Sequence, residues 1–402
     1  MKTYYTKNNI GKTAKILRRG GLVAVPTETV YGLAGSALDE KTVRRIYEVK
    51  GRPEVKPLSM MVPDAEALER WCVGVPKAAK ALAARFWPGP LTLVLTAAPE
   101  VPELTRAGKP TVGLRCPDHP LTLELLRRTG LPLAAPSANP SGAPSPKTAE
   151  EVRAYFDGKI DAVLDGGPCG LGRESTILDL SAPPYRILRQ GALSEDEILT
   201  ALRESLTLIG ITGGTGCGKT TALNVLRNKG ALILDCDEIY HGLTVTSEPM
   251  REELIARFGP VYDGTTLDRK ALGAVVFADP EALRNLNAIT HKYVAEELTH
   301  LLTDFALRGG TLAAIDAIGL LDIDYSRKTA FNVAVTAPTE ARVERLMQRE
   351  GISREYALQR IGAQKSNDYF ADHCDYVLEN DGTLAAFEQK CEAFFTEVLE
   401  HV

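Results

Sequence analysis

The sequence has neither an excess of positive charge nor a cysteine pattern that would hold a metal or a disulfide framework. Its 402 residues include 47 lysines and arginines against 52 aspartates and glutamates, a net charge of −5. This balance argues against strong direct binding of nucleic acid and leaves room only for a local basic cleft. The cysteines are odd in number and form no C-x-x-C pair, which predicts reduced thiols in a cytoplasmic protein. They are Cys72, Cys116, Cys169, Cys217, Cys236, Cys374 and Cys391.

Long apolar runs, flexible linkers and internal repeats are also missing. Residues 1–9 are polar and the apolar stretches are only as long as strands, so we expect no signal peptide, no membrane-spanning helix and no membrane partner. The length suffices for two cores, because single domains usually have ~100 to 200 residues. Both halves mix strand-like and helical segments. We therefore predict two α/β domains, residues 1–205 and 206–402, joined through a helix that a capping box opens at Ser194 to Glu197.

A complete phosphate-binding loop, G-G-T-G-C-G-K-T, lies in the middle of the chain. An apolar run from Leu206 to Thr212 precedes it and a helical pattern that stops at Gly230 follows it. The glycines let backbone N–H groups surround an anion, Lys219 reaches the β- and γ-phosphates, and Thr220 offers a hydroxyl to Mg²⁺. The predicted ATP-binding residues here are Gly213, Gly214, Thr215, Gly216, Cys217, Gly218, Lys219, Thr220 and Thr221.

Two carboxylates follow the next predicted strand. Asp235 and Asp237 are two residues apart, and on an extended chain they would face the same side at the carboxyl edge of a parallel sheet. One can serve a metal and the other can accept a proton from an attacking hydroxyl. The alternative is that both cap the helix that follows. Next to a phosphate-binding loop we favour the catalytic interpretation.

A charged helical stretch near residues 342–360 is rich in arginine. Guanidinium groups on such a stretch can close over phosphates as a lid, although most arginines on an exposed helix are simply solvated. We therefore expect only one or two of them to bind ATP, with Arg345 and Arg349 first. The arginines are Arg342, Arg345, Arg349, Arg354 and Arg360.

Residues 207 to about 395 resemble dephospho-CoA kinase. The matching stretches are IGITGGTGCGKTT, DCDEI, FGPVYDGTTLDRKALGAVVFADPEALRNLNAITH and VAVTAPTEARVERLMQREGISREYALQRIGAQ. The resemblance implies ATP-dependent phosphorylation of the ribose 3′-hydroxyl of dephospho-CoA, on a parallel sheet wrapped by helices. It further implies that Lys219 is catalytic, that Asp237 is the general base and contacts the acceptor with Arg269 and His291, and that Thr220 and Asp235 serve Mg²⁺.

The chain departs from this family at two places. Residues 319–323 replace the usual Pro-Leu-Leu-x-Glu segment, which leaves the acidic role there open between Asp316 and Asp322, and Lys292 stands where a proline is usual. The alternative for this half is another small-molecule kinase with a phosphate-binding loop, such as one for a nucleoside or a sugar.

The first half groups its polar residues unusually. Pro26 to Leu33 places hydroxyls and a carboxylate after a strand-like run, and Lys50 and Arg52 would point to one face of an extended segment, although an exposed basic turn is the commoner reason for such a pair. Further cations and hydroxyls follow. Together they predict a cleft for a nucleotide and an amino acid. These further groups are Thr111–Arg115, Ala134–Gly142, Glu174–Ile177 and Ile187–Arg189.

Residues 8–195 resemble the YrdC-like family of threonylcarbamoyl-AMP synthases. The stretches GGLVAVPTETVYGLAG, KGRPEVKPL, FWPGPLTLVL, TVGLRCPDHP and APSANPSGAPSP carry the resemblance. It implies a twisted mixed α/β sheet and the condensation of L-threonine, bicarbonate and ATP into threonylcarbamoyl-AMP and pyrophosphate. The tRNA-modification machinery that makes threonylcarbamoyladenosine would consume the product. The alternative is an RNA-binding or ribosome-assembly module, against which the lack of a basic surface counts.

The same resemblance implies site residues. Lys50 and Arg52 would stabilise charge at the α-phosphate, and no residue is expected to act as a covalent nucleophile. Met61 stands where some members have a histidine. The implied threonine-binding residues are Thr29, Arg115, Ala135 and Ser175. The implied ATP-binding residues are Arg52, Lys56, Thr111, Ser137, Asn139, Ser145 and Arg189.

Overall fold

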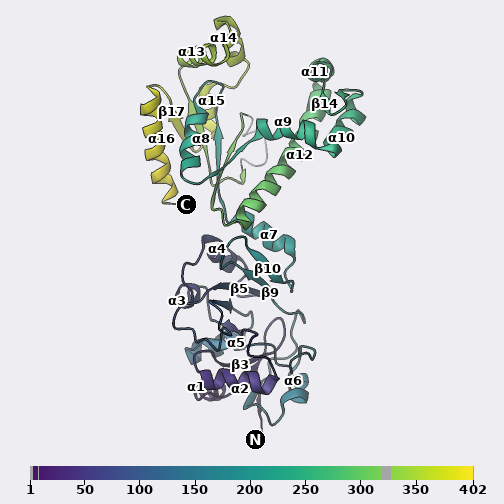
Figure 1. The fold of residues 1–402 in the computed structure, drawn as a ribbon, viewed down its shortest axis with the longest axis vertical. Coiled ribbons are helices and arrows are strands. Elements are labelled where there is room, and N and C mark those ends of the chain that lie inside the picture. Colours follow the sequence, from purple (N-terminus) through teal and green to yellow (C-terminus); the bar gives the residue numbers. More distant parts are fainter. Residues whose placement is uncertain (1–2, 8, 319–326, 402) are drawn as a thin grey trace. The chain divides into compact units, whose positions relative to one another are not determined.

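The structure is a computed structural model that describes residues 3–7, 9–318 and 327–401. The chain divides into two compact units with a boundary between Ser205 and Leu206, and the short segment Leu307–Gly309 groups with the first unit. Each unit has its own sheet and its own helices (Figure 1). Residues 319–323, where the chain departs from the kinase pattern, lie outside the described residues, and Asp322 is among them.

The first unit is built on a ten-stranded sheet with both parallel and antiparallel pairs. The strand order is β1-β8-β2-β3-β7-β4-β6-β5-β9-β10. The sheet contains parallel pairs such as β4 with β6 and antiparallel pairs such as β5 with β6, which confirms the predicted mixed sheet. The strands are β1 Tyr4–Thr6, β2 Val23–Val25, β3 Gly32–Ser36, β4 Ser59–Met61, β5 Leu91–Thr96, β6 Thr111–Arg115, β7 Leu133–Ala134, β8 Ala162–Leu164, β9 Thr176–Asp179 and β10 Arg186–Arg189.

Helices with one apolar face cover this sheet. In α1 the buried residues Ile10, Ala14 and Leu17 recur at helical spacing and pack into a core with Leu125 of α5. The predicted capping box is present at the start of α7, because the Ser194 hydroxyl accepts from the Glu197 N–H and the Glu197 carboxylate accepts from the Ser194 N–H. The helices are α1 Ile10–Arg18, α2 Glu40–Lys50, α3 Ala67–Trp71, α4 Lys77–Phe86, α5 Pro120–Thr129, α6 Ala149–Phe156 and α7 Glu195–Glu204.

The second unit has a five-stranded sheet in which every pair is parallel, as the sequence predicts. Its order is β12-β15-β11-β16-β17, and a separate hairpin pairs β13 with β14. Three neighbouring strands end at Thr212, Asp235 and Asp316, so these residues share the carboxyl edge of the sheet. The strands are β11 Thr207–Thr212, β12 Leu232–Asp235, β13 Tyr262–Asp263, β14 Thr266–Leu267, β15 Leu312–Asp316, β16 Phe331–Thr336 and β17 Tyr376–Glu379.

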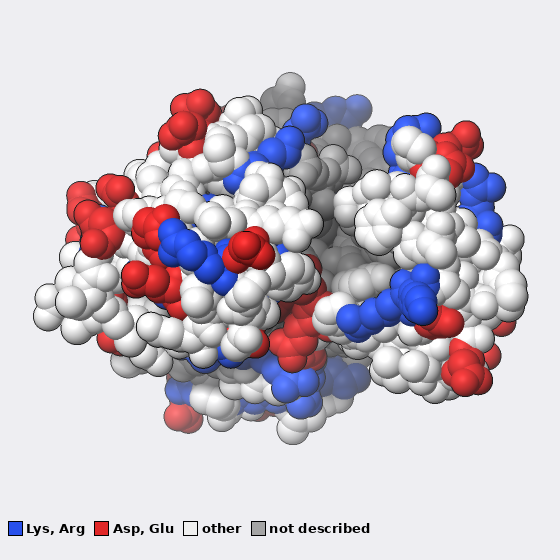
Figure 2. All heavy atoms as spheres, turned by 90° about the horizontal axis from the view of Figure 1, so that it is seen from above, with Lys and Arg blue, Asp and Glu red and all other residues white. Residues whose placement is uncertain are grey.

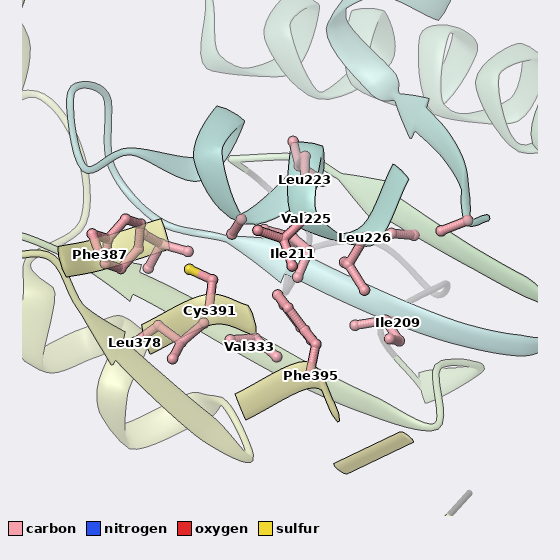
Figure 3. Close-up of a cluster of buried hydrophobic side chains, with 14 of the residues drawn as sticks. Ile209, Ile211, Leu223, Val225, Leu226, Val333, Leu378, Phe387, Cys391 and Phe395 are labelled. Carbon is pink, nitrogen blue, oxygen red and sulfur yellow. The ribbon is translucent and has the colours of Figure 1, made fainter. Parts of the chain in front are cut away.

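The core of the second unit lies between its sheet and two helices, α8 and α16. Figure 3 shows Ile209 and Ile211 of β11 facing Leu226 of α8 and Phe395 of α16. The apolar, β-branched central strand β11 is buried on both faces, as is typical of a parallel sheet. The helices are α8 Lys219–Asn228, α9 Cys236–Thr246, α10 Glu248–Phe258, α11 Arg269–Val276, α12 Pro280–Leu307, α13 Thr339–Glu350, α14 Arg354–Gly362, α15 Asn367–His373 and α16 Leu384–Leu399.

Two sequence-based expectations concern the whole chain. All seven cysteines lie in the described part of the chain and are free thiols, as predicted. Within the described ranges, every helix is too short or too polar to cross a bilayer.

The burial of Phe395 indicates how much the packing of α16 contributes to the stability of the second unit. We expect Phe395→Ala to lower the free energy of unfolding by about 3–5 kcal/mol, because a fully buried ring is replaced by a cavity. Hydrogen-exchange protection of the β11 and β16 amides in the full chain measures the loss. Glu397→Ala, at an exposed position of the same helix, is the control and should change stability by less than about 0.5 kcal/mol. Equal effects of the two changes would contradict the prediction.

Candidate active sites

A cavity of about 640 Å³ opens in the first unit beside β4, β5, β6 and β9. Its wall combines charged side chains with an apolar part formed by Val94, Ile177 and Leu188. A cavity of this size and mixed lining is typical of small-molecule sites. Eight of the predicted site residues line it: Arg52, Lys56, Thr111, Arg115, Ala135, Ser137, Ser175 and Arg189.

Arg115, at the end of β6, is a buried guanidinium held from behind. Its Nη2 donates to Glu28 Oε1 and to Thr29 Oγ1, both at 2.8 Å, and only 8% of its side chain is exposed. Its Nε is buried without a hydrogen-bond partner, which is unusual for a guanidinium N–H. Thr29 is itself fully buried. The structure therefore places the Thr29 side chain behind Arg115 and not in the cavity lining.

Lys50 is buried and is not among the residues that line the cavity. It is the last residue of α2, which ends at the left-handed Gly51, so Lys50 and Arg52 do not lie on one extended segment as expected. The Lys50 ammonium donates to the backbone carbonyls of Ser137 and Asn139. Burial, assisted by the nearby Arg52 and opposed by Glu174, lowers its pKa to about 8. In the structure Lys50 fixes the 137–139 turn, and its role at the α-phosphate stays a prediction.

Two other predicted ATP-binding residues stabilise the cavity wall from behind. The Asn139 amide donates to the Pro140 and Ala143 carbonyls at 3.0 and 2.6 Å, and the Ser145 hydroxyl donates to Glu174 Oε1 at 2.8 Å. Neither side chain belongs to the lining. Asn139 fixes the turn of residues 139–143, and Ser145 fixes the Glu174 carboxylate.

Arg52 and Arg189 face the cavity and are held mainly by backbone carbonyls. Arg52 donates to the Lys56 and Pro57 carbonyls at 3.1 and 2.9 Å, and Arg189 donates to the Ser175 carbonyl at 2.8 Å. Burial lowers the pKa of both guanidinium groups, and each stays protonated. Arg189 also forms an ion pair with Glu174.

Sequence reasoning missed several residues of this cavity. Glu174 was noticed only as part of a polar segment, yet its carboxylate lines the cavity and links Arg189 to Ser145. Lys109 and Asp179 also line it. The local sequence around Lys109 and Asp179 contains no motif that would have marked them.

A second pocket, of about 650 Å³, lies at the carboxyl edge of the parallel sheet in the second unit. The phosphate-binding loop from Gly214 to Thr220 forms one wall, and Asp237, Asp316 and three arginines form the others. Gly213 precedes the pocket with φ of 136°, and a Cβ there would lie 2.1 Å from the Val335 carbonyl oxygen. Lys219 Nζ donates to the Gly213 carbonyl at 3.1 Å.

The two predicted carboxylates occupy different environments. Helix α9 begins at Cys236, so Asp235 and Asp237 do not share an extended segment as expected. Asp235 Oδ1 accepts the Asp237 and Glu238 N–H groups at 2.9 and 3.0 Å, which makes Asp235 the N-cap. Asp237, in the first turn, lines the pocket. A capping function is thus observed for Asp235, and its metal-binding role stays a prediction.

Asp316, at the end of β15, is the second carboxylate of the pocket. Its Oδ1 lies 3.8 Å from Lys219 Nζ and is buried without a hydrogen-bond partner. Burial, opposed by Lys219 and assisted by Asp235 and Asp237, raises its pKa to about 6. Among the described residues, no three histidine, cysteine, aspartate or glutamate side chains gather in a metal-binding arrangement.

The predicted lid arginines separate into three kinds. Arg345, Arg349 and Arg360 line the pocket. The sequence favoured Arg345 and Arg349 as ATP-binding residues and did not single out Arg360. Arg342 is buried behind the loop, and Arg354 is exposed and paired with Glu340 at 2.7 Å. Figure 2 shows the molecule from the top of Figure 1. On this face the lysine and arginine side chains (blue) are interspersed with aspartate and glutamate side chains (red).

The predicted acceptor residues come from the part of the second unit formed by α9–α12. Arg269 begins α11, and its Nη2 lies 3.1 Å from His241 Nδ1 of α9. His291 lies exposed on α12. Of the three predicted acceptor residues, Asp237 belongs to the pocket lining, while Arg269 and His291 keep their roles as predictions.

The raised pKa of Asp316 predicts a stability cost. Its ordinary value of 3.8 rises to about 6, so the folded state binds the proton more tightly and stability is lost as pH rises from about 4 to 6. We expect Asp316→Asn to stabilise the second unit by about 1–2 kcal/mol at pH 7, because one pKa unit is worth about 1.4 kcal/mol and the buried amide keeps part of the cost. The gain should vanish near pH 4.

Urea denaturation at pH 4 and pH 7, followed by pulse proteolysis, measures this difference. Asp381→Asn is the control, since that carboxylate is 60% exposed and its pair with Lys390 is weak. A stabilisation that is equal at both pH values would refute the assignment of the cost to an ionised Asp316.

Comparisons with known proteins agree with the division into two units. The model of the Sua5, YciO and YrdC family, described as "Telomere recombination", matches residues 15–191, and the "Dephospho-CoA kinase" model matches residues 207–386. "Threonylcarbamoyl-AMP synthase" of Bacillus subtilis is 48% identical over 191 residues, covering 47% of this chain and 55% of the relative. The protein of the same name from Pyrococcus abyssi is 48% identical, with 48% and 56% covered.

A shorter relative is matched over most of its length. "Putative threonylcarbamoyl-AMP synthase" of Mycobacterium tuberculosis H37Rv is 38% identical over 186 residues, which cover 46% of this chain and 85% of the relative. The chain spans only about half the length of the Bacillus and Pyrococcus relatives. The first unit makes this chain a member of the Sua5, YciO and YrdC family, and residues 207–386 of its second unit match the dephospho-CoA kinase family model.

Proposed function

We propose that the chain is a bifunctional enzyme with one active site in each unit. Residues 1–205 would condense L-threonine, bicarbonate and ATP into threonylcarbamoyl-AMP and pyrophosphate. Residues 206–402 would use ATP to phosphorylate the 3′-hydroxyl of dephospho-CoA. The names of the relatives and of the kinase model support both activities. The product of the first unit would pass to the machinery that modifies tRNA.

The observation that carries the first activity is a cavity with two kinds of anion site. The buried guanidinium of Arg115, with an unpaired Nε, suits the carboxylate of an amino acid, and Ser175 and Ala135 line the same space. Arg52, Lys56 and Arg189 suit the phosphates of a nucleotide. The apolar wall formed by Val94, Ile177 and Leu188 offers a surface for its base.

Catalysis in this cavity would rest on positioning and charge. A carbamate formed from threonine and bicarbonate attacks the α-phosphorus of ATP, and pyrophosphate leaves. The negative charge that builds up in this step is stabilised by guanidinium groups that are already fixed by backbone carbonyls, as Arg52 and Arg189 are. Fixed donors need no reorganisation during the reaction.

The kinase activity rests on the pocket around the phosphate-binding loop. Lys219 and the loop would hold the β- and γ-phosphates, and Arg349 and Arg360 would neutralise charge on the transferred group. Asp237 would accept the proton of the attacking hydroxyl, with Arg269 and His291 on the acceptor side.

Mg²⁺ would accompany the nucleotide and supply positive charge between the phosphate groups. The donor set fits a magnesium ion that takes most of its ligands from water and phosphate: the hydroxyl of Thr220 and the carboxylate of Asp316, whose Oδ1 has no hydrogen-bond partner. Asp235 is the predicted alternative, although its Oδ1 already accepts two N–H groups.

An assay of the intact chain tests both activities. We expect release of pyrophosphate from ATP only when threonine and bicarbonate are both present, and phosphorylation of dephospho-CoA but not of adenylate, uridine or gluconate. The paired substrate omissions and the three other acceptors are the controls. Pyrophosphate release without bicarbonate would reject the synthase, and transfer to uridine or gluconate would reject the kinase assignment.

Two substitutions test whether the sites act independently. We expect Lys219→Ala to lower the kinase rate by at least about 100-fold and to leave the synthase unchanged, because a cation on the transferred phosphate is lost. Arg52→Ala should do the reverse. Steady-state rates of both reactions on each variant provide the measurement, and the untouched activity is the control. Loss of both activities from either change would reject independent sites.

A further inference from the structure

Thr215 of the phosphate-binding loop is held on both of its backbone groups by two side chains. Arg342 Nε donates to the Thr215 carbonyl at 2.9 Å, and the Thr215 N–H donates to Gln364 Oε1 at 2.8 Å. Arg342 Nη2 also donates to Gln364 Oε1 at 3.3 Å, which closes the ring. Arg342 comes from α13 and is 3% exposed, and Gln364 follows α14.

The next two carbonyls of the loop are held in the same way. Asn380 Nδ2 donates to the Cys217 carbonyl at 2.9 Å, and Arg345 Nη1 donates to the Gly216 carbonyl at 3.2 Å. Arg345 Nη2 donates to Asn380 Oδ1 at 3.0 Å, which joins the two side chains. Three consecutive carbonyls are thus bound by side chains from residues 342–380.

This arrangement determines where the loop N–H groups point. In a trans peptide the carbonyl of one residue and the N–H of the next point in opposite directions. Carbonyls that are bound by Arg342, Arg345 and Asn380 therefore turn the following N–H groups to the opposite side of the loop. The Cys217 N–H donates to the Gly214 carbonyl at 3.3 Å within the loop, so the N–H groups of Gly216 and Gly218 are the ones left to face an anion.

Two loop glycines are required by the same contacts. A Cβ at Gly214 would lie 2.3 Å from Arg342 Nη2, and a Cβ at Gly218 would lie 2.2 Å from Asn380 Nδ2. Any side chain at either position would displace the group that binds the loop. The glycines thus admit the supporting side chains as well as allowing the turn.

We propose that Arg342, Gln364 and Asn380 are positioning residues that fix the phosphate-binding loop in its anion-binding form before ATP arrives. Arg342 acts through Thr215 and does not touch a phosphate, unlike the arginines of the same helical stretch that line the pocket. This inference rests on the proposed ATP-dependent kinase. It deepens that proposal by separating arginines that orient the loop from arginines that face the nucleotide.

The test is a double-mutant cycle on Arg342→Met and Gln364→Met in the full chain. All variants carry Arg52→Ala, which removes a predicted ATP contact of the first unit. Titration calorimetry with ATP then reports on the second unit, whether or not dephospho-CoA is the kinase acceptor. Each single change should weaken ATP binding about tenfold, because a hydrogen bond to a charged group or a buried N–H is lost. The double variant should bind ATP at most about twofold more weakly than either single variant, because both changes break the same ring of hydrogen bonds.

Kinase kinetics supply the second readout. We expect the KM for ATP to rise about tenfold and the KM for dephospho-CoA to stay within twofold. Arg354→Met is the matched control, since Arg354 lies on the neighbouring helix, is exposed and pairs only with Glu340 among the ion pairs described for it. It should leave both KM values unchanged.

Three outcomes would overturn the inference. They are wild-type ATP affinity in both single variants, independent losses that multiply in the double variant, and a fall in kcat with both KM values unchanged, which indicates partial unfolding. A wild-type chain that binds ATP but does not phosphorylate dephospho-CoA would reject the proposed acceptor alone, because the calorimetric cycle would still measure the loop.

Discussion

Buried and half-buried cations held by backbone carbonyl oxygens organise both units. Burying a charge is costly unless it is hydrogen-bonded, and a carbonyl satisfies a cation without cancelling its charge. Lys50 binds the Ser137 and Asn139 carbonyls, Arg52 binds the Pro57 carbonyl, and Arg342 binds the Thr215 carbonyl. Each contact fixes a turn. Arg52, which also lines the cavity, keeps a positive charge available to an anionic ligand.

Carboxylate partners have a different effect, because they offset charge as well as fixing geometry. Glu28 holds Arg115 by one nitrogen and accepts the Asp118 N–H with its other oxygen, so the guanidinium keeps its orientation with Nε unpaired. Glu174 pairs with Arg189 inside the cavity lining, where a phosphate of the proposed nucleotide would compete with it. The first unit therefore combines a permanently held arginine with one whose partner is replaceable.

The sequence predicted most reliably what depends on neighbours in the chain. The strand, loop and helix from Leu206 to Asn228, the capping box at Ser194 and the parallel sheet all follow from local pattern. The spacing of charged residues gave a wrong prediction where a helix boundary lay between the two residues of a pair. Lys50 ends a helix and Asp235 caps one, so neither pair of charged residues lies on the extended segment that the spacing suggested. Glu174 contacts Ser145, which lies 29 positions earlier in the chain, and Gln364 contacts Thr215, which lies 149 positions earlier. Contacts between residues so far apart leave no local sequence pattern.

The arginine-rich stretch near residues 342–360 shows why residue type alone does not assign a role. Arg342 and Arg349 are seven residues apart on α13, two turns of one helix, yet the first is 3% exposed behind the loop and the second lines the pocket. The difference comes from what lies opposite each side chain. Arg342 meets a peptide group in a space that the glycines leave open, whereas Arg349 meets the pocket. Arg342 and Arg345 attach helix α13 to the loop, and this attachment fixes the position of Arg349 in the pocket. The same helix therefore determines both the geometry of the loop and the placement of the charge.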